Sequence, residues 1–248
     1  MPNSVLEYDP QYQGLCLNSD YGELNVDVYK TDNQEGGDAL IVEISTAKTL
    51  LYSCGQVSRD PEKECESIVK LFQDPNVYPT FAKGTSIPEA DTTKSYLNKC
   101  RLWKSGYPFS LFVIEDQKDG SFVGRIVMED CDPHPVTGSP MHSHAEVGIA
   151  ISGEKQHQGF GTQAITAVTY AWVPYVADAK YEIQGKPLTH LWATAHPDNA
   201  TSKIFSKAGY ENKGTFDHPI YKKPRNEFVK EVENATEISN RSRLKFKI

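Results

Sequence analysis

The residues best suited to chemistry form one short turn, which consists of Gln156, His157, Gln158, Gly159, Phe160, Gly161 and Thr162. An apolar, strand-like run at 147–151 precedes the turn, and an apolar-periodic run at 163–173 that predicts a helix follows it. Glycine lets the backbone come close to a ligand. The first N–H groups of a helix have no intrahelical partners and lie at the positive end of its dipole. We therefore expect the main chain of 158–162 to bind a phosphate-bearing cofactor, with Thr162 able to cap the helix.

The composition indicates a soluble globular protein with one large domain or two small ones. The chain has 248 residues, 38% hydrophobic and 24% charged, which is enough to bury a core without disulfides. Its five cysteines are scattered, which favours free thiols. A net charge of −7 argues against nucleic acid as a partner and weakly favours cationic substrates. Because we find neither a signal-peptide pattern nor an apolar run of ~20 residues, we expect a cytoplasmic protein without a membrane partner.

Periodicity and turn residues predict alternating strands and helices. Strands are expected at 39–45, 110–115, 122–128, 146–152 and 188–195, with a last strand or hairpin at 210–216 and 220–221. Helices are expected at 60–73, 92–103, 163–173 and 198–208, with Asp91 capping the second and Gly209 following the last. The polar residues 1–38 predict a partly ordered extension or an extra strand pair. This order predicts an α/β domain with a mixed sheet, whose ligand lies where the strand before the glycine turn diverges from its neighbour.

Five blocks of sequence follow one another in the order seen in a known family. They are LFQDPNV at 71–77, FVIE with FVG at 112–124, AEVGI at 145–149, the turn Gln156-x-x-Gly159-x-Gly161, and PDNATS with KAGY at 197–210. Together they resemble the GNAT superfamily of acyl-CoA-dependent N-acyltransferases, and most closely its branch that acetylates the amino termini of ribosomal proteins. The resemblance spans roughly residues 40–222.

The resemblance implies the GNAT fold, with a mixed, mostly antiparallel central sheet, flanking helices and a splayed strand pair at the cofactor site. It implies an N-terminal extension at 1–38, an acetyltransferase domain at 39–222 and a charged C-terminal tail at 223–248. Acetyl-CoA would be the cosubstrate. The turn 156–162 would hold its pyrophosphate, the main chain of Ile149, Ala150 and Ile151 would pair with the pantetheine amides, and Asn199 would anchor the pantetheine arm or the neighbouring strand end.

The implied reaction is direct attack of an amine on the thioester. An alkyl amine has a pKa near ~10, so a base must remove a proton at neutral pH. Glu146 in its apolar strand is the expected base, with a raised pKa, and His142 and His144 are alternatives. Ser202 matches the group that protonates the leaving thiolate. The segment 199–209 is one residue shorter than in the family, so Asp198 and Thr201 could take the places of the expected Asn and Ser, and no tyrosine acid is evident.

Several alternatives remain open at this point. The acceptor could be a peptide amino terminus, our first expectation, or a small cationic amine such as an aminoglycoside or a polyamine. The protein could also be a non-catalytic acyl-CoA-binding module. Cys131, His134, His142 and His144 could form a zinc site, but their spacing lacks the framework of a zinc finger, and we expect no metal.

Overall fold

The computed structural model describes residues 7–8, 25–33, 37–56, 58–81, 84–131 and 133–234. Within these ranges the main sheet contains, in spatial order, β1 (Glu7–Tyr8), β2 (Asn25–Asn33), β3 (Gly37–Ser45), β4 (Thr49–Ser53), β5 (Leu111–Asp116), β6 (Phe122–Asp130), β7 (His144–Ile151), β10 (His190–Ala195), β12 (Lys223–Glu231) and β11 (Glu211–His218). A separate ribbon pairs β8 (Glu182–Ile183) with β9 (Lys186–Pro187). The neighbouring strands of the described sheet run antiparallel except β7 and β10, which run parallel.

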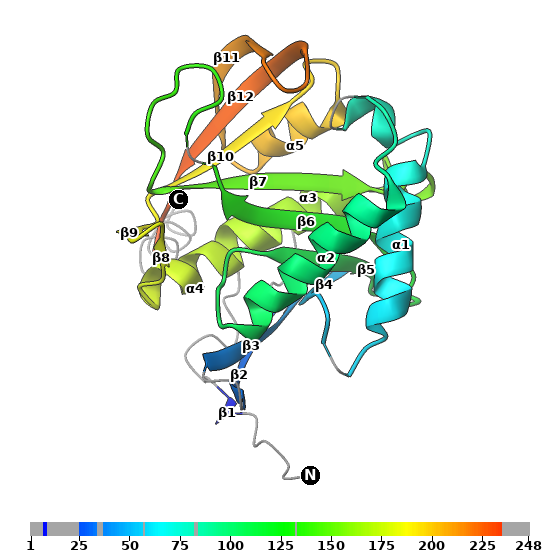
Figure 1. Cartoon of the computed structure of the whole chain (residues 1–248), viewed down its shortest axis with the longest axis vertical. Helices are drawn as coiled ribbons and strands as arrows, with labels where there is room; N and C mark the ends of the chain where they lie inside the picture. Colours follow the sequence, from blue (N-terminus) through cyan, green and yellow to red (C-terminus); the bar gives the residue numbers. More distant parts are fainter. Residues whose placement is uncertain are drawn as a thin grey trace, which may run out of the picture.

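Helices cover both faces of this sheet. They are α1 (Pro61–Gln73), α2 (Glu89–Lys104), α3 (Phe160–Ala167), α4 (Val173–Asp178) and α5 (Ala200–Lys207), with the short 3₁₀ turns η2 (Tyr78–Thr80) and η3 (Gly153–Lys155). A π-helical turn, η4 (Val168–Trp172), joins α3 to α4. The helices α1 and α2 lie on one face, α3 and α4 lie on the other, and α5 packs beside β10 and β12 (Figure 1). This is the mixed, mostly antiparallel sheet with flanking helices that the sequence predicts.

The two helices on the first face begin in different ways. The Asp60 side chain caps α1 by accepting a hydrogen bond of 3.1 Å from the Lys63 N–H, so the helix predicted at 60–73 is confirmed. In contrast, α2 begins at Glu89, before the predicted start, and its N-cap is Pro88. The expectation that Asp91 is the cap is therefore wrong. Its own N–H already donates to the Pro88 carbonyl at 3.1 Å, so Asp91 lies inside the first turn, where its charge complements the helix dipole.

The hairpin of β5 and β6 lies next to β7 because of one glycine. In the register of this pairing, Gly124 lies opposite Ile151 at the end of β7. A Cβ atom at Gly124 would lie 2.2 Å from the Ala150 carbonyl oxygen, which is far inside van der Waals contact. Only glycine allows β6 to follow β7 this closely, and the hairpin predicted at 110–128 is confirmed with β5 and β6 as its strands.

The ends of the described chain contribute more strands than the sequence indicates. β2 pairs along its whole length with β3, and β4 was not expected. β12 begins at Lys223, where a charged tail was predicted, and it lies between β10 and β11. Its sequence, KPRNEFVKE, shows little apolar alternation because its buried side chains are only Phe228 and Lys230. Residues 235–248 of the predicted tail, and most of the predicted extension, lie outside the described residues. None of the helices described could cross a membrane, since each is too short or too polar.

Candidate active site

A gap opens between β7 and β10 in the middle of the sheet. These two parallel strands pair only where His144–Glu146 of β7 meet His190–Trp192 of β10. Beyond that point β7 continues to Ile151 and β10 continues to Ala195, and no pairing joins them. The peptide groups of β7 that face the gap are therefore left out of the ladder and can bind an extended ligand that carries amides. This is the splayed strand pair expected from the sequence, and Glu146 is the residue at which it opens.

The glycine turn lies between the end of β7 and α3. Gly159 is the N-cap of α3, with φ of 89°, a conformation in which glycine avoids strain. No side chain caps this helix, so the expectation that Thr162 does so is wrong. Since the helix starts at Phe160, Thr162 lies within its first turn. The first N–H groups of α3 are consequently free of side-chain caps, as an anion-binding helix end requires.

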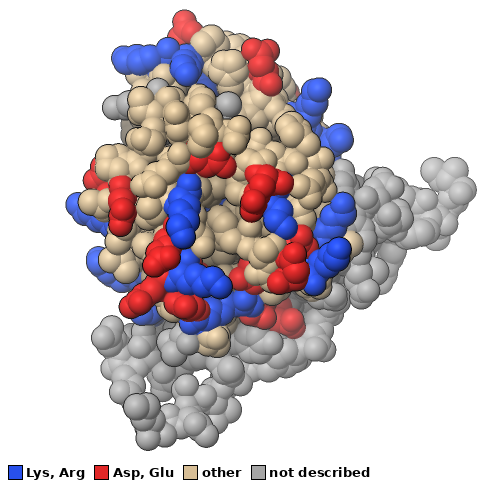
Figure 2. Space-filling model, turned by 90° about the vertical axis from the view of Figure 1, so that its right-hand side faces the viewer, with Lys and Arg blue, Asp and Glu red and all other residues tan. Residues whose placement is uncertain are grey.

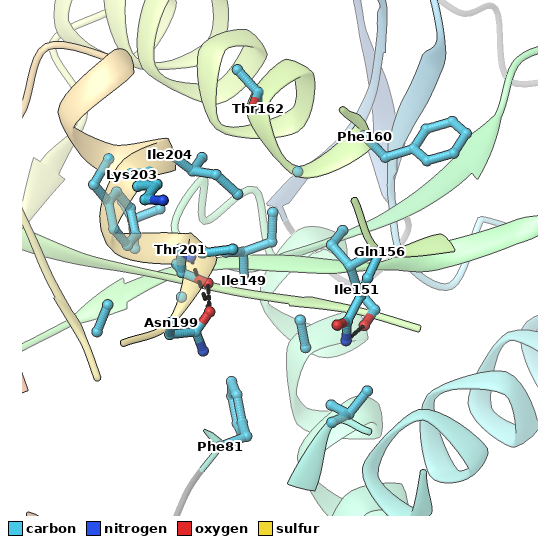
Figure 3. Close-up of a pocket in the computed structure, with 18 of the residues that line it drawn as sticks. Phe81, Ile149, Ile151, Gln156, Phe160, Thr162, Asn199, Thr201, Lys203 and Ile204 are labelled. Carbon is cyan, nitrogen blue, oxygen red and sulfur yellow. Dashed lines mark hydrogen bonds between the residues drawn. The ribbon is translucent and has the colours of Figure 1, made fainter. Parts of the chain in front are cut away.

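Two predicted cofactor ligands also support the local main chain (Figure 3). The amide of Gln156 donates to the Ile151 carbonyl at 3.1 Å, which ties the turn to the end of β7. The side chain of Asn199 accepts hydrogen bonds of 2.9 Å from both the N–H and the hydroxyl of Thr201, so it is the N-cap of α5. Asn199 thus caps α5, and its predicted role in binding a ligand, with its remaining amide donors, stays a prediction.

A cavity of about 630 Å³ joins the turn, the gap and Glu146. The predicted site residues that line it are Glu146, Ile149, Ala150, Ile151, Gln156, His157, Gly159, Phe160, Gly161, Thr162 and Asn199. Two predicted residues do not line it. The Gln158 amide donates to the Glu154 carbonyl at 2.7 Å, and the Ser202 hydroxyl donates to the His196 carbonyl at 3.0 Å. The hydroxyl of α5 that does line the cavity belongs to Thr201.

Glu146 lies in a setting that suits a general base. Burial raises its pKa to about 7, and the carboxylate of Glu129 adds to the rise, whereas Arg225 and Lys99 act against it. Glu129 lies directly opposite Glu146 in the pairing of β6 with β7, and the ammonium of Lys99 forms an ion pair with Glu129. A carboxyl group with a pKa near neutrality is present in both protonation states at neutral pH, so it can accept a proton and release it again.

Sequence reasoning missed several side chains of the cavity, among them Arg125, Glu129, Tyr221 and Arg225. Tyr221 lies in the turn between β11 and β12, with the Arg225 guanidinium 4.3 Å from its ring centre. Burial and the negative charge of Glu146 raise the pKa of Tyr221, so its hydroxyl is protonated at neutral pH. The sequence contained one signal for Arg125, because it is the charged residue within the apolar strand FVGRIVM. Tyr221 and Arg225 had none, because β12 itself was not recognised.

The candidate zinc ligands have other partners. His134 contacts Glu227 at 3.1 Å, and His142 contacts Gln184 at 3.0 Å. The rings of His144 and His190 stack with their centres 4.7 Å apart. In the described part of the chain, no group of three or more His, Cys, Asp or Glu side chains is arranged to hold a metal ion.

Comparison with known proteins identifies a family. A family model described as an acetyltransferase (GNAT) domain matches residues 59–211, more than half of the chain. No curated protein sequence matches this chain. Solved structures with a similar fold include the ribosomal-protein-S5-alanine acetyltransferase from Vibrio fischeri, with a TM-score of 0.56 and 14% identity over 77% of this chain and 97% of that one.

Two further structures of similar fold contain acetyl-CoA or a disulfide of CoA. Mycobacterium smegmatis RimJ in complex with CoA-disulfide has a TM-score of 0.51 and 15% identity, over 78% of this chain and 88% of that one. The microcin C7 self-immunity acetyltransferase MccE in complex with acetyl-CoA and AMP has a TM-score of 0.53 and 14% identity, over 75% of this chain and 93% of that one. At such identities the likeness establishes the fold and leaves the acceptor open.

Proposed function

Because this chain belongs to the GNAT acetyltransferase family, we propose that it transfers an acetyl group from acetyl-CoA to a primary amine, with a peptide amino terminus as the acceptor. One observation carries the proposal. The gap between β7 and β10 opens at Glu146, and the same cavity continues to the uncapped start of α3. A base and an anion-binding helix end therefore lie at two ends of one cavity, as transfer from a nucleotide thioester to an amine requires.

The residues around the cavity fit acetyl-CoA. The main chain of 149–151 offers peptide groups that the sheet does not use, and the first N–H groups of α3 would hold the pyrophosphate. Lys203 also lines the cavity and adds positive charge, and Lys155, another lining residue, is paired with Asp116 at 3.1 Å. When bound, acetyl-CoA supplies a thioester carbonyl that an amine can attack.

Glu146 performs the proton transfer in this proposal. The carboxylate accepts a proton from the incoming ammonium group, directly or through water, and leaves a neutral amine that can attack. Its pKa of about 7 is matched to this task at neutral pH. Three hydroxyl groups are candidates for protonating the departing thiolate. Ser202 remains the prediction from sequence, whereas Thr201 and Tyr221 are hydroxyls that line the cavity.

A substitution at Gly161 tests the cofactor site. A Cβ atom at Gly161 would lie 3.0 Å from the Ile204 Cδ1 atom and 3.6 Å from the Ile151 side chain, between α5 and β7. We expect Gly161→Glu to weaken CoA binding at least about a hundredfold, because the longer side chain brings bulk and negative charge into the cavity. Isothermal titration with CoA measures the effect. Gly161→Ala is the matched control, since the flexible end of Ile204 can move aside.

Turnover tests the reaction itself. Acetyl-CoA is incubated with peptides and small amines, and release of the CoA thiol is followed for the native protein. Release that depends on an amine supports the proposal. CoA binding without release on any amine would instead favour a non-catalytic acyl-CoA-binding module, and retained CoA affinity in Gly161→Glu would contradict the assignment of the turn.

A further inference from the structure

Arg125 is a cation in the wall of the cavity that is held by aromatic rings. It lies on β6 opposite Ala150 of β7 and lines the same cavity as Glu146. Its guanidinium lies 4.5 Å from the ring centre of Phe72 and 5.6 Å from that of Phe81. The two rings are themselves in contact, with their centres 5.0 Å apart. Stacking of this kind fixes the plane of a guanidinium and leaves its edge free to donate hydrogen bonds.

No acidic side chain of the described chain pairs with Arg125. Neither an ion pair nor a side-chain hydrogen bond joins its guanidinium to the residues that the structure describes. The carboxylate that influences it most is that of Glu129, which is already paired with Lys99. Arg225, the other arginine of the cavity, differs because it donates to the Thr194 hydroxyl and carbonyl, both at 3.2 Å. Arg125 is thus a charge with five donors and no anion.

The charge of Arg125 persists at neutral pH. Burial lowers its pKa to about 10, a value at which the guanidinium is still protonated at pH 7. Placing an unpaired charge in such a setting costs free energy unless an opposite charge arrives. A planar carboxylate is well suited to the free edge of a guanidinium, because the two can form paired hydrogen bonds.

Arg125 and Glu146 lie on the same face of the neighbouring strands β6 and β7, four residues apart along the ladder. Arg125 and Glu129 share a face of β6, since they are four residues apart, and Glu146 lies opposite Glu129. The rise of a strand gives a separation of about 13 Å between the Cα atoms of Arg125 and Glu129, part of which the long arginine side chain can span. The cavity therefore presents the carboxylates of Glu129 and Glu146 at a distance from the guanidinium of Arg125, while Arg225, which lines it too, donates to Thr194.

We propose that the acceptor is a dipolar molecule, whose amine lies at Glu146 and whose carboxylate is bound by Arg125. This inference rests on the proposed acetyl transfer and names the acceptor class for that same site. The carboxylate could be an acidic side chain at the second or third position of a peptide, or the α-carboxylate of a free amino acid. A polyamine or an aminoglycoside fits poorly, because it brings only positive charge to Arg125.

Peptides that differ in one charge test the proposal. A matched set begins with the same residue, carries Glu, Gln or Lys at the second or third position, and has an amidated C-terminus. Free amino acids form the second arm and distinguish an α-carboxylate from an acidic side chain. Two quantities are measured, namely kcat/KM for release of the CoA thiol and the affinity of each acceptor for the CoA-loaded protein by calorimetry.

For the native protein we expect the Glu peptide, or the free amino acid, to exceed the uncharged counterpart by about tenfold in both quantities. Arg125→Gln should reduce this preference to within about twofold, and Arg125→Glu should reverse it in favour of the Lys peptide. Affinity for CoA alone should change little in both variants, which separates Arg125 from the cofactor site. Phe81→Leu is a milder variant that should weaken the preference without removing the charge.

The outcomes separate the two proposals. Turnover or binding that is equal for Glu, Gln and Lys peptides and for matched amines without a carboxylate would overturn the role of Arg125 while acetyl transfer stands. Selective binding of the carboxylate-bearing acceptor without turnover would support Arg125 and contradict the proposed transfer. A preference that survives in Arg125→Gln would assign the anion to another residue and overturn the inference.

Discussion

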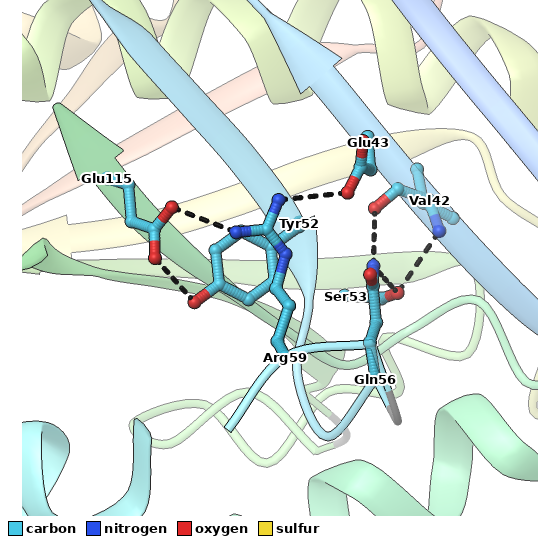
Figure 4. A network of polar contacts seen from close by, with 7 residues as sticks. All are labelled: Val42, Glu43, Tyr52, Ser53, Gln56, Arg59 and Glu115. Carbon is cyan, nitrogen blue, oxygen red and sulfur yellow. Dashed lines mark hydrogen bonds and ion pairs between the residues drawn. The ribbon is translucent and has the colours of Figure 1, made fainter. Parts of the chain in front are cut away.

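Arg59 and Arg125 both lie on aromatic rings, but their surroundings are opposite. Arg59 lies 3.7 Å from the ring centre of Tyr52 and donates at 2.9 Å to both Glu43 and Glu115 (Figure 4). The Tyr52 hydroxyl also donates to Glu115 at 3.0 Å, which closes the network. Arg125 lies against two phenyl rings and pairs with no described carboxylate. Burial acts to lower the pKa of both, but the carboxylates around Arg59 reverse the effect and raise its pKa.

The two arginines differ in whether the chain itself supplies a carboxylate partner for the guanidinium. The Arg59 network joins β3, β4, β5 and the segment before α1, and each of its charges has a partner from the chain itself. The cavity contains Arg125 without an anion and Glu146 with a raised pKa. On the face of the molecule that carries α1, acidic and basic side chains are interspersed (Figure 2). The net charge of −7 thus describes the cavity poorly, because the charges in its wall depend on their own neighbours.

The largest contrast is expected between two glutamates. Glu146→Gln should lower kcat by about a hundredfold or more, because the base is lost, and it should leave CoA affinity within about twofold. Above pH 7 it should not lower the free energy of unfolding, because a raised pKa means that ionised Glu146 disfavours the folded state. Glu115→Gln should do the reverse, with near-native kcat and a loss of about 2 kcal/mol in unfolding free energy. Chemical denaturation and thiol release measure both.

A loss of stability in Glu146→Gln together with full activity would contradict the contrast directly. It would mean that the carboxylate is a structural partner whose raised pKa has no catalytic use. Equal losses of activity in both variants would show instead that the network of Arg59 supports the site.

The pH dependence of kcat/KM should show whether Glu146 is the group that titrates. Since Glu146 must be ionised to accept a proton and its pKa is about 7, kcat/KM should rise with pH through about 7. Glu129→Gln should move this midpoint to lower pH, because it removes a like charge opposite Glu146 and frees Lys99 to stabilise the ionised form. Measuring kcat/KM at on the order of ten pH values between about 5 and 9 tests this shift of the midpoint. An unchanged midpoint would rule out Glu146 as the titrating group.

The smallest effects are expected at the hydroxyls of α5. Thr201 lines the cavity, whereas the Ser202 hydroxyl donates to the His196 carbonyl. Thr201→Val should therefore lower kcat a few-fold more than Ser202→Ala does. Tyr221→Phe provides the comparison for the cavity hydroxyl that lies outside α5. A large loss of kcat in Ser202→Ala at unchanged melting temperature would support the role predicted for Ser202 from sequence.

Local sequence rules account for much of the fold. The helix α1, the tight hairpin 116–121 and the glycine turn before α3 each depend on residues close together in the chain. They were predicted correctly for that reason, and the family match confirms the GNAT fold that the five sequence blocks implied through their resemblance to the family. The start of α2 was missed because Pro88 fixes the entry of the helix more strongly than the capping preference of Asp91.

The acceptor side of the site depends on distant pairings instead. Phe81, Arg125 and Tyr221 come from the segment after η2, from β6 and from the turn before β12. They meet only because the sheet places β6, β7, β10 and β12 side by side. No single segment contains a pattern for this convergence. Glu146 and the glycine turn could be predicted to lie at one site because both belong to one continuous stretch, 146–162, and both line the cavity.

The position of β12 has a consequence for how the protein is made. This strand lies between β10 and β11, although it leaves the ribosome after both. Until it emerges, β10 lacks its antiparallel neighbour and Arg225 is absent from the wall of the cavity. A nascent chain that stops at residue 222 would thus expose two unpaired strand edges, a hazard for aggregation, and would contain Glu146 without a finished cavity around it.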